Sequence, residues 1–341
     1  MQKMGFISIL KRVLKLKGIL ILLILVNTHY SFGQKLKSKN ISKLYQANKV
    51  ILGKEKTPNF FFKSLKPYKI ILIPGVLSES FFKEAKQKIK INFITGNIFE
   101  DHEDFLNKHK MDYQKLVLES EDTPLKNSYN IEKAILASKK KVLLFSHSKG
   151  GLDTWEAIKR NPSLLSKIQG WATVQAPFRG SAVAEFFDRH KPTQNLSKWL
   201  FQFLGGSLEG FQSLSIKTRA PYMNEIENQK LTKVINKKIT FINFASVMPN
   251  EKGWDSPLEF FRDYAYFKKG KNDGVVHIES ALLPGVDFII EQNVDHLLTV
   301  VNCNKIKKVS FKKKVSLKKR WPFDRVSHFK SILLILTRAK K

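Results

Sequence analysis

Residues 143–153 combine an apolar run, a tight turn and a serine in the arrangement that a nucleophilic serine requires. The run 143–145 indicates a buried strand, and helix-compatible residues follow the turn. Ser148 lies in the turn, with small residues two positions before it (Ser146) and two positions after it (Gly150). Small side chains are needed there because a sharp strand-to-helix turn brings these backbones close together. Ser146 stands where glycine is commoner, which adds only a little crowding. The segment predicts Ser148 as a nucleophile for acyl transfer.

A serine hydroxyl is a weak nucleophile near neutral pH, so the hypothesis requires a histidine base and an acid that orients it. Asp273 lies in a polar turn, and His296 follows the last apolar run, 286–291. In isolation each has an ordinary interpretation, as an Asn-Asp-Gly turn and as a loop or core histidine. Their order after Ser148, and their positions after predicted strands, favour a triad of Ser148, Asp273 and His296. His147, next to the nucleophile, is expected to point away from it. The acids and other histidines that fit less well are Asp255, Asp263, Glu279, Asp295, His102, His109, His190 and His277.

The oxyanion that forms during acyl transfer needs two preorganised backbone N–H donors. The amide of Lys149 comes directly after the nucleophile, at the start of the predicted helix. The second donor is expected in the turn after an early strand, residues 73–77, where Val76 follows a Pro-Gly pair. Because Pro-Gly is a common turn, the choice of Val76 depends on its position in the chain.

These residues require a scaffold of buried strands. Apolar, β-branched and aromatic runs bounded by turn residues alternate with segments of helical spacing such as 130–139. The predicted strands are residues 69–74, 92–95, 115–118, 141–145, 170–175, 239–247 and 286–291. Strands joined by helices indicate an α/β fold with a doubly wound, mostly parallel sheet. The length of 341 residues favours one catalytic domain, residues 67–304.

An apolar insertion, residues 181–238, separates two of the predicted strands. The sequence leaves two interpretations equal: helices packed on the sheet, or a lid with an apolar underside over an acyl pocket. The large apolar side chains of the insertion are Trp199, Leu200, Phe201, Phe203, Leu204, Leu208 and Phe211.

The two ends of the chain differ in composition from the middle. Residues 1–33 have the pattern of a secretory signal peptide, because a basic segment precedes the apolar run 18–26, which is too short to span roughly 30 Å of hydrocarbon comfortably. Cleavage is expected before Gln34, and the alternative is an uncleaved N-terminal membrane anchor. The protein is therefore predicted to be exported, to the periplasm, the outer surface or the medium. Residues 34–66 are expected to form a polar linker, with a loosely packed first element as the alternative, and residues 305–341 a basic tail.

The charge balance is strongly basic, since 60 Lys and Arg against 29 Asp and Glu give a formal net charge of +31. Such a surplus favours anionic partners, although a Lys-rich composition can also follow from an AT-rich genome. The tail, in which basic and apolar residues alternate, is expected either to lie on an anionic membrane surface or to be merely solvated. No nucleic-acid recognition motif accompanies the charge, so nucleic acid is not an expected partner. The single cysteine, Cys303, excludes an intramolecular disulfide.

From about residue 69 to residue 300 the chain resembles the bacterial triacylglycerol lipases and esterases of the α/β-hydrolase superfamily. Three blocks carry the resemblance: residues 146–151, residues 175–181, and residues 272–276 followed by Asp295 and His296. The middle block is similar to the Pro-His-Arg-Gly-Ser run of those lipases, with Phe178 in place of histidine. The resemblance implies cleavage of the carboxylic esters of lipids through an acyl-serine intermediate.

Two departures limit what the resemblance implies. Many of these lipases have a His-Gly pair at the oxyanion turn, where this chain has Pro74 and Gly75. Secreted relatives often hold calcium through an aspartate two residues beyond the catalytic histidine, where this chain has Leu298. No metal or other cofactor is expected. The sequence thus predicts a lipase or esterase acting on lipid esters. The alternatives are a phospholipase or lipid deacylase at anionic membranes, and a non-catalytic surface-binding protein with this fold.

Overall fold

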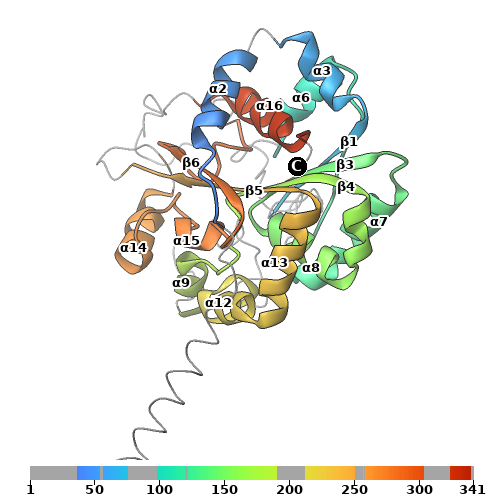
Figure 1. Ribbon diagram of the computed structural model, residues 1–341. Helices are drawn as coiled ribbons and strands as arrows, with labels where there is room; N and C mark the ends of the chain where they lie inside the picture. The colour runs from blue at the N-terminus through green and yellow to red at the C-terminus, as the bar shows by residue number, and fades with distance from the viewer. Residues whose placement is uncertain are drawn as a thin grey trace, which may run out of the picture. The chain divides into compact units, whose positions relative to one another are not determined.

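The computed structural model describes residues 37–53, 57–75, 98–119, 122–189, 212–249, 256, 258–302 and 323–338. Within these residues, six parallel strands form one sheet in the order β2-β1-β3-β4-β5-β6 (Figure 1). The strands are β1 (Tyr68–Ile73), β2 (Tyr113–Lys115), β3 (Lys141–His147), β4 (Ile168–Val174), β5 (Thr240–Val247) and β6 (Asp287–Gln292). The predicted α/β fold with a doubly wound parallel sheet is confirmed.

The order of the strands reverses between β1 and β3, because β2 lies outside β1 while β3 and the later strands lie on its other side. Open parallel sheets bind their ligands beyond the carboxyl ends of the strands at such a point. Ile73 pairs with Ser146, so the turns that follow β1 and β3 leave the sheet side by side. The topology therefore brings residues 74–75 next to Ser148.

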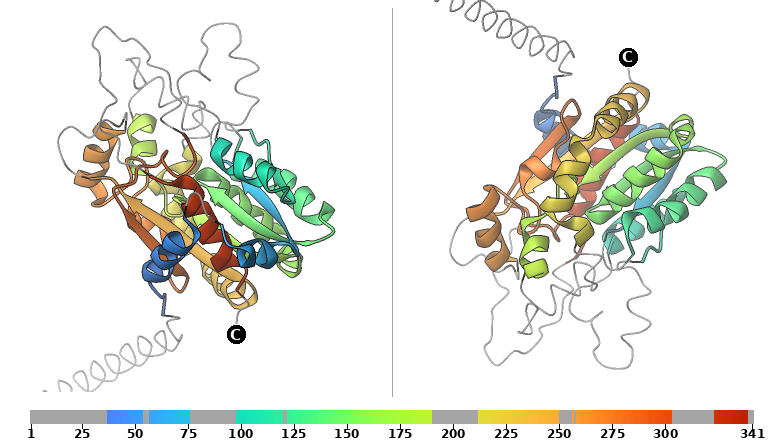
Figure 2. Two further views of the ribbon diagram at one scale, coloured as in Figure 1. Left: turned by 90° about the horizontal axis from the view of Figure 1, so that it is seen from above. Right: turned by 90° about the horizontal axis from the view of Figure 1, so that it is seen from below.

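Helices cover both faces of the sheet, as the buried strand β3 requires: Leu143, Leu144 and Phe145 have no exposed surface. Figure 2 shows one layer from above and the other from below. The first layer holds α2 (Ser42–Leu52), α3 (Asn59–Leu65), α6 (Glu100–Lys108) and α16 (Arg325–Leu336); the second holds α7 (Pro124–Ala137), α8 (Lys149–Arg160) and α13 (Ile226–Lys238). The other helices are α9 (Ala182–Arg189), α12 (Ile216–Asn224), α14 (Glu259–Lys269), α15 (Ile278–Ala281) and a 3-10 helix, Pro162–Ser166.

The strand predictions agree with the structure except at one edge. The edge strand expected at residues 115–118 is β2, three residues at Tyr113–Lys115. The Leu116 amide makes a last 3.0 Å hydrogen bond to the Leu72 carbonyl oxygen of β1, and the side chains of Leu116 and Leu118 are buried beyond the end of the strand. The strand expected at residues 92–95 lies outside the described residues.

Two terminal segments belong to the folded core, which corrects the predicted linker (34–66) and basic tail (305–341). Helix α16 is buried through Phe329, Ile332 and Leu333, and α2 packs directly against it. The Tyr45 hydroxyl lies 2.8 Å from Nδ1 of His328, and the ammonium of Lys330 donates to the backbone of α2. The basic composition predicts a solvated tail, but the Lys330 ammonium is hydrogen-bonded to buried carbonyl oxygens at the end of α2 and is not solvated. Residues 305–322 lie outside the described residues.

Within the predicted insertion, residues 181–238, the structure describes the helices α9, α12 and α13. The last part of the insertion is α13, a crossover helix that packs on the sheet and leads directly into β5, with Ile235 fully buried. The large apolar side chains from Trp199 to Phe211 lie outside the described residues, so the lid stays a prediction. The predicted signal segment, residues 1–33, also lies outside them. None of the helices that the structure describes has the length and apolarity needed to cross a membrane.

His102 of α6 lies fully buried in the layer between the sheet and α16. Its ring touches Phe99, Phe145 and Phe329, with centroids 5.3, 5.7 and 4.7 Å away. Neither ring nitrogen has a hydrogen-bond partner among the described residues. Burial, with a smaller contribution from the nearby Arg325 charge, lowers the pKa of His102 to about 3, so the ring is neutral at ordinary pH.

Candidate active site

Ser148 lies on a strained turn between β3 and α8. Its φ of 52° and ψ of −128° are unusual for a residue with a side chain, and such strain persists only where the surroundings enforce it. A Cβ added at Gly150 would lie 2.5 Å from the carbonyl oxygen of Pro74, so this position has room for glycine alone. The Ser146 hydroxyl accepts a 2.9 Å hydrogen bond from the indole of Trp171, which explains how serine is accommodated where glycine is commoner.

The structure brings the three residues of the predicted triad together. The Ser148 Oγ lies 2.9 Å from Nε2 of His296, and Nδ1 of His296 lies 2.8 Å from Oδ2 of Asp273. The other carboxylate oxygen, Oδ1, accepts from the amides of Val275 (2.9 Å) and Val276 (2.7 Å). Because the carboxylate can only accept, the imidazole donates from Nδ1, and Nε2 is left to accept the serine proton. All three side chains are buried, with Ser148 6% exposed.

Asp273 and His296 lie on two loops that hold each other in place. Asp273 follows α14, and His296 follows β6; the His296 amide donates to the Asp273 carbonyl oxygen at 2.9 Å. The alternative acid Asp263 is instead paired with Arg262 at 2.7 Å. Asp295, next to the histidine, accepts from the amides of the two residues that follow His296. Of the alternatives that the structure describes, these two are therefore engaged elsewhere.

Gln175 supports the loop that carries His296, a role that the sequence did not indicate. It sits just beyond β4 with a positive φ of 56° and is fully buried. Its amide nitrogen donates to the Ser246 hydroxyl at 2.6 Å and to the Asp295 carbonyl oxygen at 3.0 Å. Its amide oxygen accepts from the Thr299 hydroxyl at 2.7 Å. One side chain thus fixes both flanks of the histidine.

His147 contacts the backbone of the base and not the nucleophile's hydroxyl. Its Nε2 lies 3.0 Å from the His296 carbonyl oxygen, so this nitrogen must donate. Burial, followed by the neighbouring His296, lowers the pKa of His147 well below the ordinary value. A neutral ring here adds no positive charge beside His296.

The two predicted oxyanion donors differ in what the structure shows. The Lys149 amide lies at the first residue of α8, and a Cβ added at Gly75 would lie only 2.9 Å from its nitrogen. The turn after β1 therefore lies directly over this amide. Val76, the predicted second donor, lies outside the described residues.

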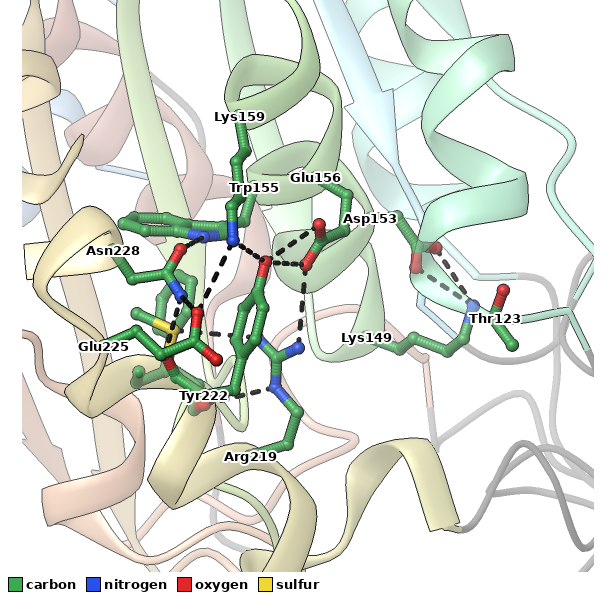
Figure 3. A network of polar contacts seen from close by, with 12 residues as sticks. Thr123, Lys149, Asp153, Trp155, Glu156, Lys159, Arg219, Tyr222, Glu225 and Asn228 are labelled. Carbon is green, nitrogen blue, oxygen red and sulfur yellow. Dashed lines mark hydrogen bonds and ion pairs between the residues drawn. The ribbon is translucent and has the colours of Figure 1, made fainter.

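The Lys149 side chain forms a buried ion pair behind the nucleophile (Figure 3). Its ammonium lies 3.0 and 3.2 Å from the two carboxylate oxygens of Asp153, one turn along α8, and both side chains have no exposed surface. Asn127 of α7 donates to the same carboxylate at 3.0 Å. Burial raises the pKa of Asp153 to about 6, and the Lys149 charge offsets part of that rise. The pair ties the first turn of α8 to its own second turn and to α7.

A second network in Figure 3 joins α12 and α13 to the outer face of α8. The Tyr222 hydroxyl donates to Glu156 at 2.7 Å, and the Arg219 guanidinium lies 3.7 Å from the same carboxylate. The indole of Trp155 donates to Asn228 at 3.4 Å. These contacts anchor the described second half of the insertion to the nucleophile helix.

No group of three or more His, Cys, Asp or Glu side chains in the described part of the chain is arranged to hold a metal ion. The arrangement that the described side chains offer is a hydroxyl, that of Ser148, hydrogen-bonded to a histidine that is in turn hydrogen-bonded to a carboxylate, which suits nucleophilic chemistry.

The fold is shared with solved ester hydrolases. A metagenomic carboxyl esterase superimposes with a TM-score of 0.62 at 17% sequence identity, over 88% of this chain and 92% of the esterase. The mature lipase of Bacillus licheniformis gives a TM-score of 0.50 at 21% identity, over 68% of this chain and 86% of the lipase. No protein-family profile and no curated protein matches the sequence. The likeness shows that this chain shares the fold of these solved hydrolases.

Proposed function

We propose that the protein is a serine carboxylic-ester hydrolase, a lipase or esterase that acts on lipid esters. The observation that carries the proposal is the continuous hydrogen-bonded chain from Ser148 through His296 to Asp273 on a strained strand-to-helix turn. Such a chain activates a hydroxyl that is otherwise inert near neutral pH. The shared fold of a carboxyl esterase and a lipase supports the same reaction class.

The mechanism is acyl transfer in two halves. His296 removes the Ser148 proton as the oxygen attacks the ester carbonyl, and the Asp273 carboxylate stabilises the resulting imidazolium. The amides of Lys149 and Val76 hold the oxyanion, and His296 returns the proton to the departing alcohol. Water then attacks the acyl-serine with His296 again as base, which releases the acid and restores the hydroxyl. This route requires no metal or organic cofactor.

Phospholipid deacylation at an anionic surface is the second candidate. The formal net charge of +31 favours it, because cationic proteins accumulate at anionic headgroups within about a Debye length, roughly 8 Å at physiological salt. The bond that breaks and the residues that break it are the same, so the two candidates differ only in the leaving alcohol.

The test is hydrolysis of p-nitrophenyl esters from short to long acyl chains by the full chain, beside Ser148→Ala. We expect kcat to fall by several orders of magnitude in the variant, and a fluorophosphonate probe to label the wild type alone. The acyl-length profile separates esterase from lipase, and release of fatty acid from phosphatidylglycerol micelles tests the second candidate. A wild type that is inactive on every ester and unlabelled by the probe would refute the proposal.

A further inference from the structure

Helix α14 exposes aromatic residues on the face that points away from the core. Phe261, Arg262 and Ala265 form its buried side. Phe260 and Phe267 are 55% and 84% exposed. They are seven positions apart, about two helical turns, so they project from the same side. Phe260 contacts the rings of Phe186 and Phe261, with centroids 6.0 and 5.1 Å away, and still leaves 55% of its surface exposed. An outward helix face is ordinarily polar, so the exposed surface of these two rings suits an apolar partner.

The charges on α14 are arranged so that its C-terminal end is cationic. Its acidic residues Glu259 and Asp263 lie 3.2 and 2.7 Å from the same guanidinium, that of Arg262. Three exposed lysines follow, Lys268, Lys269 and Lys271, and within the described residues none of them forms an ion pair. The exposed aromatic rings are thus bordered by positive charge. Lysines beside exposed aromatic rings suit the interface between anionic headgroups and acyl chains.

Helix α14 and the residues just before it contact the two loops that carry Asp273 and His296. Leu258 fills the space beside Gly274, where an added Cβ would lie 2.7 Å from the leucine Cβ. Asn272 donates to the Arg262 carbonyl oxygen at 3.1 Å, and Ser256 donates to the Asp295 carboxylate at 2.9 Å. In Figure 2, α14 lies at the same end of the sheet as α9, against which it packs. A surface that binds α14 therefore lies next to the end of the sheet that carries Ser148, Asp273 and His296.

We propose that the outward face of α14, with Phe260, Phe267 and the lysines 268, 269 and 271, docks the protein on an anionic lipid bilayer. The two rings enter the headgroup and upper acyl region, and the ammonium groups pair with headgroup phosphates. The inference rests on the proposed function in one respect: docking brings lipid esters to the Ser148 end of the sheet. It identifies the bilayer, and not only a dissolved ester, as the partner of this enzyme.

The test measures sedimentation of the full chain with sucrose-loaded vesicles of phosphatidylcholine mixed with phosphatidylglycerol. A Ser148→Ala background keeps the lipids intact, so that binding is read independently of hydrolysis. We expect Phe260→Ser and Phe267→Ser each to weaken vesicle binding about tenfold, since each removes a large apolar side chain from the bilayer. The matched control is Val50→Ser in α2, because Val50 is 83% exposed and α2 lies away from α14 in Figure 2. This control should bind like its parent.

Equal binding by the double phenylalanine variant and the Val50→Ser control would overturn the proposal, because the lipid contact would then lie elsewhere. Failure of the parent to bind would overturn it as well. If the double substitution instead converts a dimer to a monomer in sedimentation velocity and leaves vesicle binding unchanged, the face binds a second copy and the lipid proposal is wrong. With Ser148 restored, the double variant should hydrolyse a short soluble p-nitrophenyl ester at the wild-type rate. Vesicle sedimentation therefore reports loss of docking, and hydrolysis of the soluble ester reports loss of the esterase chemistry.

Discussion

Asp273→Asn is the sharpest test of the triad, because the two carboxylate oxygens have different partners. Oδ1 accepts from the amides of Val275 (2.9 Å) and Val276 (2.7 Å), whereas Oδ2 faces Nδ1 of His296 at 2.8 Å. In the variant, the side-chain oxygen must stay on the two backbone donors, since an NH₂ group there would oppose them. The NH₂ group then faces His296, whose Nδ1 has to accept, and the ring proton moves to Nε2. A protonated Nε2 cannot take the Ser148 proton.

The expected loss is large and confined to catalysis. The same exchange in a serine, histidine and aspartate triad lowers kcat about 10⁴-fold, which corresponds to about 5.5 kcal/mol of activation free energy. We expect this loss in kcat on a short p-nitrophenyl ester, with KM and the thermal unfolding midpoint little changed because the two residues have the same shape. Asp263→Asn is the control: its carboxylate is 57% exposed and pairs with Arg262, so activity should change less than about twofold. An Asp273→Asn enzyme within about tenfold of wild type would refute the assigned role.

Three further perturbations test the scaffold of the site. Gly150→Ala places a Cβ 2.5 Å from the Pro74 carbonyl oxygen, so the free energy of unfolding should drop by about 1–3 kcal/mol and kcat should fall; unchanged thermal unfolding would contradict the close approach. Gln175→Leu removes the amide that bonds both flanks of the histidine loop, so kcat should fall about tenfold at constant KM; a change in KM alone would refute a positioning role. His102→Phe removes a buried ring whose nitrogens lack partners, and should stabilise the fold by about 1–3 kcal/mol in thermal unfolding at pH 7. The unfolded chain, but not the folded one, takes up a proton at this histidine as the pH falls from 6.5 towards 3, so wild-type stability declines in that window, and the variant should decline less.

The convergence of Ser148, Asp273 and His296 could be predicted from the sequence because a parallel sheet brings the carboxyl ends of its strands to one edge. Each residue follows an apolar run or a turn signal, and their order in the chain excluded most other histidines. The supporting residues Gln175 and His147 could not be found in this way. Their roles depend on a positive φ after β4 and on a carbonyl oxygen across the site, neither of which leaves a pattern in residue types.

The predictions of a linker at residues 34–66 and a tail at residues 305–341 are wrong for a related reason. Composition treats lysine and arginine as solvated, yet Lys330 donates to the end of α2, and Arg325 pairs with Asp101 at 2.8 Å. The burial of Lys330 and Arg325 depends on partners more than 200 positions away in the sequence, and no local window contains those partners. The apolar run 332–336 was the one local signal, and it was too short to separate a core helix from a tail.

The pairing of α2 with α16 has a consequence for the order in which the protein can be assembled. Tyr45 and His328 meet although they are 283 positions apart. Gly170 of β4 is covered by the last turn of α16, where an added Cβ would lie 2.7 Å from the Leu336 carbonyl oxygen. The part of this face that α16 covers, over β3, β4 and β5, therefore stays open until the chain has been synthesised past residue 325. Contacts of such long sequence separation form late and slowly. A nascent chain that has not reached residue 325 would leave apolar residues of the sheet exposed there, so the fold cannot be completed before α16 has been synthesised.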